Sequence, residues 1–536
     1  MQMEDRPTMR RKTLLVITCL TLLLMCGTVA AQQPSFRELD HYIADAMHDA
    51  EIPALVIAVV KDDAVVFAKG YGVRKLGDNA PVDEHTIFNI ASVTKGFTTA
   101  SLAMLVDQGK LGWDDHVLKY LPTFQLYDSY ATRELTVRDL LTHRTGLTDN
   151  DALCLDSTYS RDEILYRIRF WQPKLGFRAQ FDYNNCMYVV AGQIIPAITG
   201  RCWDDFVHER IFRPLGMKDS STSIAELHGD NVAMPHRIVN GTVQALPLPN
   251  NDNFAPAGGI NSTAVDMAQW ARLQLGGGVY QGQRLLSLQR VKELQTPNID
   301  VDFSEGLDKL QFPADHFAAY GLGWIVMDYH GRKVVFHTGS NPGFKSEILL
   351  VPEEHLGVVI LSNFFDRPPW VLGYRVIDAY LGLPVRDRAG EYLKALKGFE
   401  QENETENKKQ QAERNRNTKP SLPMEEYAGR YTNDLYGDAV VSFKNGETSL
   451  NMPAKPCLNW KNCGALSCNF ARRETVRAST KKSKRHSRFL RSRTGNAFSL
   501  GSLPQGLPYL DGDPTFVPCL LHEWAIVTRR LIAAIW

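Results

Sequence analysis

The 536-residue sequence predicts an α+β fold, an α/β sandwich whose antiparallel sheet is built from both ends of the main domain. Two Val-rich segments near the N-terminus have the composition of strands. Further strand-like segments follow much later and are separated by short turns, which suit antiparallel pairing because parallel strands need long crossovers. The residues between these two groups favour helices and predict an inserted all-helical lobe. We expect a functional site in the cleft between sheet and lobe.

The predicted elements follow in order along the chain. Residues 35–50 carry apolar side chains at helical spacing, and Pro53 ends this first terminal helix. The first two strands form a hairpin around Lys61–Asp63, and Trp370–Leu381 is the second terminal helix. We expect both terminal helices to cover the sheet. The predicted strands are Ala54–Val60, Ala64–Val73, Tyr320–Met327, Lys333–His337, Ser346–Val351 and Gly357–Ser362.

Residues 1–31 have the features of an export signal. Basic residues precede an uncharged apolar run and a group of small residues that ends at Ala31. We interpret this segment as a signal peptide cleaved after Ala31 or as an uncleaved N-terminal anchor, because the uncharged stretch approaches membrane-spanning length. Both alternatives predict an exported protein, periplasmic or extracellular. In an oxidising compartment, Cys154, Cys186 and Cys202 allow at most one disulfide among them.

The rest of the chain divides by composition. The main domain is predicted over residues 32–385, followed by a charged linker, helical or disordered, over residues 386–420. Residues 421–455 begin a small β domain that is incomplete, because the strand pattern stops where an atypical basic, Cys-containing tail begins, residues 456–536. We interpret the tail as disordered or as the product of a reading-frame change. No nucleic-acid partner is expected, although the basic run within the tail keeps that alternative open, since the formal net charge of the chain is +0 at pH 7.

A Ser-x-x-Lys motif, Ser92 to Lys95, lies at the start of an apolar segment with helical character. In a helix that begins near Ser92, positions i and i+3 share one face, so the hydroxyl and the amine lie side by side. A serine needs a nearby base to act as a nucleophile, and a lysine becomes a base when desolvation or a neighbouring cation lowers its pKa. Taken alone, the motif is weak evidence, because it occurs by chance in many proteins.

Two further motifs strengthen it. Tyr183-Asn184-Asn185 precedes an apolar helix in the lobe, and His337-Thr338-Gly339 ends a predicted strand. In this order the three motifs resemble those of the serine β-lactamase and penicillin-binding-protein superfamily, specifically its class C β-lactamase-like branch. The segments Leu140–Leu147 and Pro256–Ser262 also match that branch, and the resemblance covers roughly residues 35–385. We interpret His143, within the first of these segments, as a residue that holds a loop.

The resemblance implies a mechanism. Ser92 attacks an acyl carbonyl, and Lys95 and Tyr183 share the proton transfers, with the choice of general base left open between them. The backbone N–H groups of Ser92 and Ser340 are implied to form the oxyanion hole. The residues implied to bind the substrate or support the site are Asn185, His337, Thr338, Gly339 and Ser340. No spacing of Cys and His in the sequence predicts a metal site, and no cofactor is implied.

His337 stands where a lysine in the third motif would present an ammonium group to a substrate carboxylate. A histidine is mostly neutral near pH 7, with a reference pKa of about 6.5, so carboxylate recognition is weakened and esterase or peptidase activity is favoured. We predict an exported serine hydrolase that acts through an acyl-enzyme on a β-lactam, a D-amino-acid peptide or a small ester. The alternatives are a penicillin-binding or sensor protein that is acylated without turnover, and an inactive scaffold. The expected partner is a small-molecule or peptide substrate, and the oligomeric state stays open.

Overall fold

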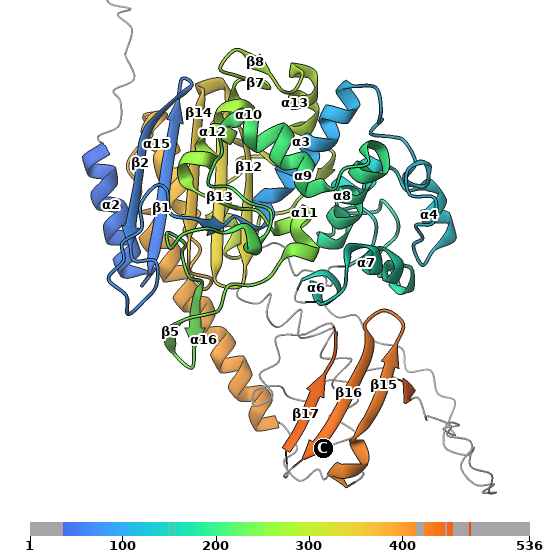
Figure 1. Ribbon diagram of the computed structural model, residues 1–536. Helices are drawn as coiled ribbons and strands as arrows, with labels where there is room; N and C mark the ends of the chain where they lie inside the picture. The colour runs from blue at the N-terminus through green and yellow to red at the C-terminus, as the bar shows by residue number, and fades with distance from the viewer. Residues whose placement is uncertain are drawn as a thin grey trace, which may run out of the picture.

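An eight-stranded sheet forms the centre of the molecule, in the order β2-β1-β14-β13-β12-β11-β10-β9 (Figure 1). The computed structural model describes residues 36–148, 151–155, 157–413, 423–444, 447–453 and 471–472. All neighbouring strands of the sheet are antiparallel, which confirms the predicted fold class. The strands are β1 (Ala54–Lys61), β2 (Ala64–Gly72), β9 (Ile299–Asp300), β10 (Ala318–Tyr320), β11 (Ile325–Tyr329), β12 (Arg332–Asn341), β13 (Phe344–Val351) and β14 (Leu356–Ser362).

The two ends of the domain meet between β1 and β14. The predicted hairpin is present, and its turn contains Asp62 and Asp63, which both have left-handed backbone conformations, with φ of 51° and 62°. Two consecutive positive φ values are typical of the tight turn that matches the twist of paired strands. On its other edge β1 pairs with β14 from Leu55 opposite Ser362 to Lys61 opposite Leu356. The strands from the start of the domain and those from its end therefore belong to one sheet, as the sequence predicts.

Two predicted strands have different limits in the structure. The segment Tyr320–Met327 is not one strand, because a turn separates β10 from β11: the Gly321 N–H donates to the Trp324 carbonyl (2.7 Å), and Gly323 has a φ of +77°. The second is the strand Lys333–His337, which the sequence predicts to end at the His-Thr-Gly motif. That prediction is wrong because β12 keeps pairing with β13 beyond the motif, as far as Asn341 opposite Phe344.

Helices cover both faces of the sheet (Figure 1). Helices α2, α15 and α16 pack on one face, and α3, α8 and α12 belong to the apolar core on the other face. The predicted charged linker forms a helix, α16, in its described part. Tyr392 and Leu396 of this helix are buried in the same apolar core as α2 and α15. The helices are α2 (Phe36–Asp49), α3 (Thr94–Asp107), α4 (Ser129–Glu134), α5 (Val137–Leu141), α6 (Asp151–Cys154), α7 (Arg161–Arg167), α8 (Asn185–Thr199), α9 (Trp203–Val207), α10 (Arg213–Leu215), α11 (Ala255–Gly258), α12 (Ala264–Leu275), α13 (Leu288–Leu294), α14 (Asp308–Gln311), α15 (Val371–Tyr380) and α16 (Arg388–Glu413).

Side chains of the helical lobe donate hydrogen bonds to backbone carbonyls of a second, four-stranded sheet, in the turn between β15 and β16. The Tyr159 hydroxyl donates to the Tyr436 carbonyl (3.0 Å), and Arg167 Nη1 donates to the Asp434 carbonyl (2.7 Å). Its strands, in the spatial order β17-β16-β15-β18, and the short paired strands elsewhere are β15 (Gly429–Asn433), β16 (Gly437–Lys444), β17 (Glu447–Asn451), β18 (Ala471–Arg472), β3 (Phe88–Asn89), β6 (Asn261–Ser262), β4 (His236–Val239), β5 (Thr242–Ala245), β7 (Val279–Tyr280) and β8 (Gln283–Arg284).

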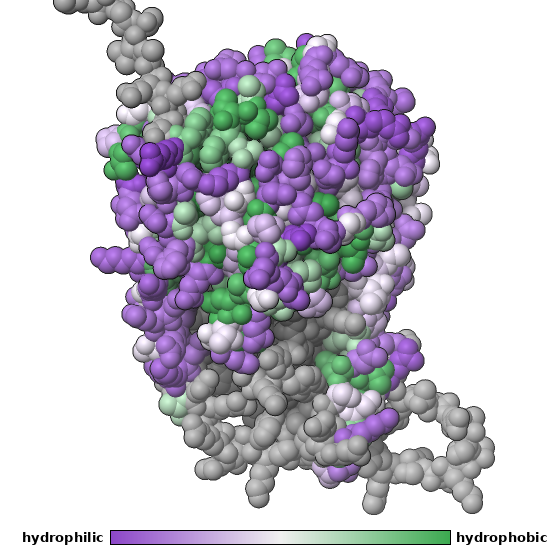
Figure 2. Space-filling model, turned by 60° about the vertical axis from the view of Figure 1, so that its left-hand side comes forward, coloured by the Kyte–Doolittle hydropathy of each residue, from purple (hydrophilic) through white to green (hydrophobic). Residues whose placement is uncertain are grey.

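The predicted export segment, residues 1–31, lies outside the described residues, as does all but Ala471 and Arg472 of the predicted tail. In the part of the chain that the structure describes, no helix combines the length and hydrophobicity that a transmembrane span requires. The face that carries α2 and the edge strand β2 is mostly hydrophilic, with hydrophobic patches between the polar residues (Figure 2).

Candidate active site

Ser92 and Lys95 lie side by side at the start of α3. A short 3-10 turn, η1 (Ala91–Val93), leads directly into this helix, and Ser92 lies in that turn, two residues before the α-helix begins. Lys95 Nζ is 2.9 Å from Ser92 Oγ, as the i to i+3 spacing predicts. Ser92 is 4% exposed and Lys95 is 0% exposed, so the structure provides the desolvation that an amine base requires.

Two other segments converge on the Lys95 amine. Lys95 Nζ donates to Asn185 Oδ1 (2.6 Å), in the first turn of α8, and to the Ala257 carbonyl (3.0 Å), in α11. Neither oxygen can donate a proton. A neutral amine would therefore direct its two N–H groups to Asn185 and Ala257 and offer its lone pair to the Ser92 hydroxyl. This arrangement suits transfer of the Ser92 proton to Lys95.

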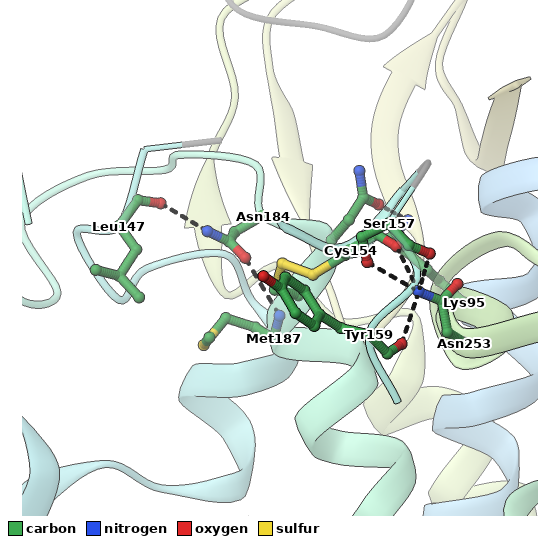
Figure 3. Close-up of a disulfide and its surroundings, with 10 residues drawn as sticks. Lys95, Leu147, Cys154, Ser157, Tyr159, Asn184, Met187 and Asn253 are labelled. Atoms are coloured by element: carbon green, nitrogen blue, oxygen red, sulfur yellow. Dashed lines mark hydrogen bonds between the residues drawn. A yellow bond between two sulfur atoms is a disulfide. The ribbon is translucent and has the colours of Figure 1, made fainter. Parts of the chain in front are cut away.

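Tyr183 lies against the same amine. Its side chain is 5% exposed, and Lys95 Nζ is 4.7 Å from the centre of its ring. The next residue, Asn184, caps α8: its side chain accepts from the Met187 N–H (3.2 Å) and donates to the Leu147 carbonyl (3.0 Å), as Figure 3 shows. The middle residue of Tyr-x-Asn is thus a helix cap, which the motif alone does not predict.

The His-Thr-Gly motif forms the strand that faces these groups. Gly339 passes so close to the nucleophile segment that a Cβ atom there would collide with the Ile90 carbonyl and the Ser346 hydroxyl, which explains the need for glycine. Ser340 follows in the same strand, and its Oγ accepts from Lys345 Nζ (2.8 Å). The pairing of β12 with β11 ends at Phe336, so the backbone from His337 onward is paired through its β13 edge.

His337 is buried and neutral. Its exposed fraction is 2%, and burial together with the nearby Lys95 lowers its pKa from 6.5 to about 3. The Tyr320 hydroxyl is 2.9 Å from His337 Nε2, and the Thr338 carbonyl is 2.6 Å from Nδ1. Thr338 is 3% exposed beside it. The strand therefore presents no cation at this position near neutral pH.

The structure brings together the residues that the three motifs predicted, from η1 and the start of α3, the segment that leads into α8, and strand β12. Their catalytic roles stay predictions. Sequence reasoning missed the Ala257 carbonyl, although the segment that contains it, Pro256–Ser262, was recognised as matching. Among the described residues, no group of three or more His, Cys, Asp or Glu side chains is placed to hold a metal ion.

A disulfide adjoins the site. Cys154, in α6, is bonded to Cys186, in the first turn of α8 and next to Asn185 (Figure 3). Cys202 is the free cysteine of the described residues. The sequence allowed one bridge among three cysteines without selecting the pair, because it does not state which two lie within bonding distance. The bridge ties the helix that carries Asn185 to the segment before α7.

The chain is similar to several known proteins. The chain is 28% identical over 436 residues to "Unguisins hydrolase ungD'" of Aspergillus campestris (strain IBT 28561), a match that covers 76% of this chain and 77% of that protein. It is 29% identical over 321 residues to "Penicillin-binding protein 4" of Amycolatopsis lactamdurans, covering 58% of this chain and 81% of the relative.

A solved structure shares the fold, the octameric penicillin-binding protein homologue from Pyrococcus abyssi, with a TM-score of 0.58 and 23% identity over 78% of this chain and 88% of that chain. The family model described as Beta-lactamase matches residues 39–381. That match spans more than half of the chain and confirms the predicted superfamily, while the class C branch stays a prediction. This protein belongs to the Beta-lactamase family.

Proposed function

We propose that this protein is a serine hydrolase that forms an acyl-enzyme on Ser92 and acts on an amide or an ester. One observation carries the proposal. The Lys95 amine is buried within 2.9 Å of Ser92 Oγ while two oxygens that cannot donate a proton, Asn185 Oδ1 and the Ala257 carbonyl, accept from it. This is the arrangement that an activated serine nucleophile needs.

The acylation step follows from these contacts. Ser92 Oγ bonds to the acyl carbon while its proton passes to Lys95. The bond from that carbon to the leaving group then breaks, and Tyr183, whose ring centre is 4.7 Å from the amine, relays the proton to the leaving group. Backbone N–H groups of Ser92 and Ser340 would stabilise the oxyanion, and loss of one such donor typically costs about 3–4 kcal/mol of transition-state stabilisation. Water then hydrolyses the acyl-enzyme by the reverse transfers.

The substrate preference is inferred from His337. Because its pKa is lowered to about 3, the imidazole is neutral at physiological pH and offers no ammonium group to a substrate carboxylate. We infer a preference for small esters or D-amino-acid peptides over penicillins. The names of two relatives refer to hydrolysis of unguisins and to penicillin binding, and both are compatible with acyl transfer to a serine.

We also propose that the protein is exported. The Cys154–Cys186 disulfide supports this proposal, because structural disulfides persist in oxidising compartments and are rare in the cytosol. The predicted signal in residues 1–31 points in the same direction. Detection of the mature N-terminus by mass spectrometry, in the culture medium and in membrane and cytosolic fractions, tests export and cleavage together.

The function is tested with a chromogenic ester, a chromogenic β-lactam and a fluorescent penicillin. Steady turnover that is lost in Ser92→Ala supports the hydrolase. A stable covalent label on Ser92 without turnover supports the sensor alternative instead, and neither label nor turnover contradicts both. Ser101→Ala is the matched control and should keep wild-type turnover. Ser101 is a buried serine in α3, the helix that follows Ser92, and its hydroxyl donates to the Phe97 carbonyl (2.8 Å).

A further inference from the structure

His143 lies behind Tyr183, outside the three motifs. It follows α5 in the lobe, is 0% exposed, and adopts a left-handed backbone conformation with φ of 54°. Its ring is surrounded by aromatic side chains: the ring centres of Tyr320 and Tyr188 lie 4.7 Å and 5.2 Å from it. Nothing in the proton transfers from Ser92 to Lys95 uses this imidazole.

The contacts of His143 hold the chain on both sides of Tyr183. The Asp182 N–H donates to the His143 carbonyl (2.7 Å), and the Asn184 N–H donates to His143 Nδ1 (2.9 Å). Between these two bonds, the Tyr183 ring stacks on the imidazole, with ring centres 4.2 Å apart and planes inclined by 29°. Tyr183 itself precedes α8 and lies in no helix or strand. The contacts with His143 therefore hold a segment that has no helix or strand hydrogen bonds of its own.

The protonation state of His143 follows from its bonds. Because Nδ1 accepts the Asn184 N–H, the proton of the neutral ring is on Nε2. Burial, with the charge of the nearby Lys95 as a smaller cause, lowers the pKa of His143 well below 6.5. The ring therefore stays an acceptor at neutral pH and keeps its bond to the Asn184 N–H.

We propose that His143 is a positioning residue that holds the Tyr183 phenol against the Lys95 amine, so that its removal slows acylation of Ser92. The proposal rests on the proposed function. A misplacement of a reacting group by about 1 Å can cost about 100-fold in rate, and a phenol on an unsupported loop is exposed to such a displacement. His143 is then more than the loop-holding residue that its sequence context suggests.

The test measures how fast Ser92 is labelled by a fluorescent fluorophosphonate, a probe that reports serine activation without the natural substrate. His143→Phe keeps an aromatic ring but removes the acceptor for the Asn184 N–H, and we expect labelling to slow by about 10- to 100-fold. His143→Asn keeps an acceptor and tolerates the left-handed conformation, so it should recover part of the rate.

His236→Phe is the matched control. His236 is also buried, and it also accepts a backbone N–H, from Leu76 (3.0 Å), so the labelling rate of this variant should match wild type.

A double variant separates positioning from general damage. In a Tyr183→Phe background the phenol is already absent, so His143→Phe should cause no further loss if it acts through that hydroxyl. Wild-type labelling in His143→Phe, or an equal loss with and without the Tyr183 hydroxyl, overturns the proposal. Absence of labelling in the wild-type protein contradicts the proposed function, and the role of His143 falls with it; a labelled wild type with unaffected variants contradicts only the role of His143.

Discussion

The two faces of the eight-stranded sheet bury polar groups in different ways. On the face with α3, α8 and α12, Lys95 bonds Ser92 and Asn185, and all three come from the ends of helices. On the face with α2, α15 and α16, Arg388 Nε donates to Asp378 Oδ2 (2.7 Å), and Tyr329 of β11 bonds both of these residues.

The difference shows what each cluster contributes. The Lys95 cluster joins a hydroxyl, an amine and an amide, which can exchange or orient a proton. The Arg388 cluster joins α16 to α15 by a buried ion pair and to strand β11 through the Tyr329 hydroxyl, which attaches α16 to the sheet. We therefore expect substitutions in the first cluster to change the rate more than the stability, and substitutions in the second to do the reverse.

The largest expected effect on rate is that of Lys95→Met. Loss of the base should lower kcat by about 1,000-fold or more. The melting temperature should change little, because an apolar side chain of similar volume replaces a buried amine without leaving a buried charge behind. Turnover and thermal unfolding measured on the same sample check this prediction. Lys333→Met, in the same sheet but at the start of β12, is the control; a large loss of stability in Lys95→Met would break the comparison.

Arg388→Met should have the opposite result. It leaves the buried carboxylate of Asp378 without its cation, which typically costs about 3–5 kcal/mol in the free energy of unfolding. The kcat of the folded fraction should stay within about twofold of wild type, because Arg388 and Asp378 lie on the face of the sheet opposite to Lys95. Urea unfolding and active-site titration measure the two quantities. The double variant with Asp378→Asn should recover part of the stability, and a double variant no more stable than Arg388→Met would contradict the ion-pair explanation.

The disulfide should affect both quantities. Replacing Cys154 and Cys186 by serine removes a link across 32 residues of sequence separation, which is expected to cost about 2–4 kcal/mol of stability. Because Cys186 adjoins Asn185, kcat should also fall, by less than in Lys95→Met. Cys202→Ser is the matched control, since that cysteine is free. Thermal unfolding with and without reductant checks the prediction, and an unchanged melting temperature would refute it.

Glu347→Gln is expected to have the smallest effect, and this effect concerns the pH dependence of stability. Both carboxyl oxygens are buried, and in the described part of the chain neither has a hydrogen-bond partner, so burial raises the pKa of Glu347 well above 4.5. The folded state then binds more protons than the unfolded state, and stability falls as pH rises from about 4.5 through the folded pKa. Glutamine removes this titration. Melting temperatures measured from pH 4 to 9 should favour the variant increasingly at high pH, and parallel curves for the two proteins would contradict the expectation.

The sequence by itself determined the parts of the protein that depend on local spacing. The i to i+3 positions of Ser92 and Lys95 place hydroxyl and amine on one helical face, and the alternation of strands with short turns predicts antiparallel pairing. The resemblance carried by the three motifs added the expectation that Tyr183 and His337 join them. These predictions succeed because each depends on residues that are close in sequence or on a recognisable motif.

Only the tertiary structure decided which distant atoms meet. Asn185 and Ala257 reach the Lys95 amine from 90 and 162 residues away, and the pairing of Cys154 with Cys186 was one of three combinations. The contact between His143 and Tyr183 is of the same kind. Such contacts depend on how helices and loops pack around the sheet, and local propensity carries no information about that packing.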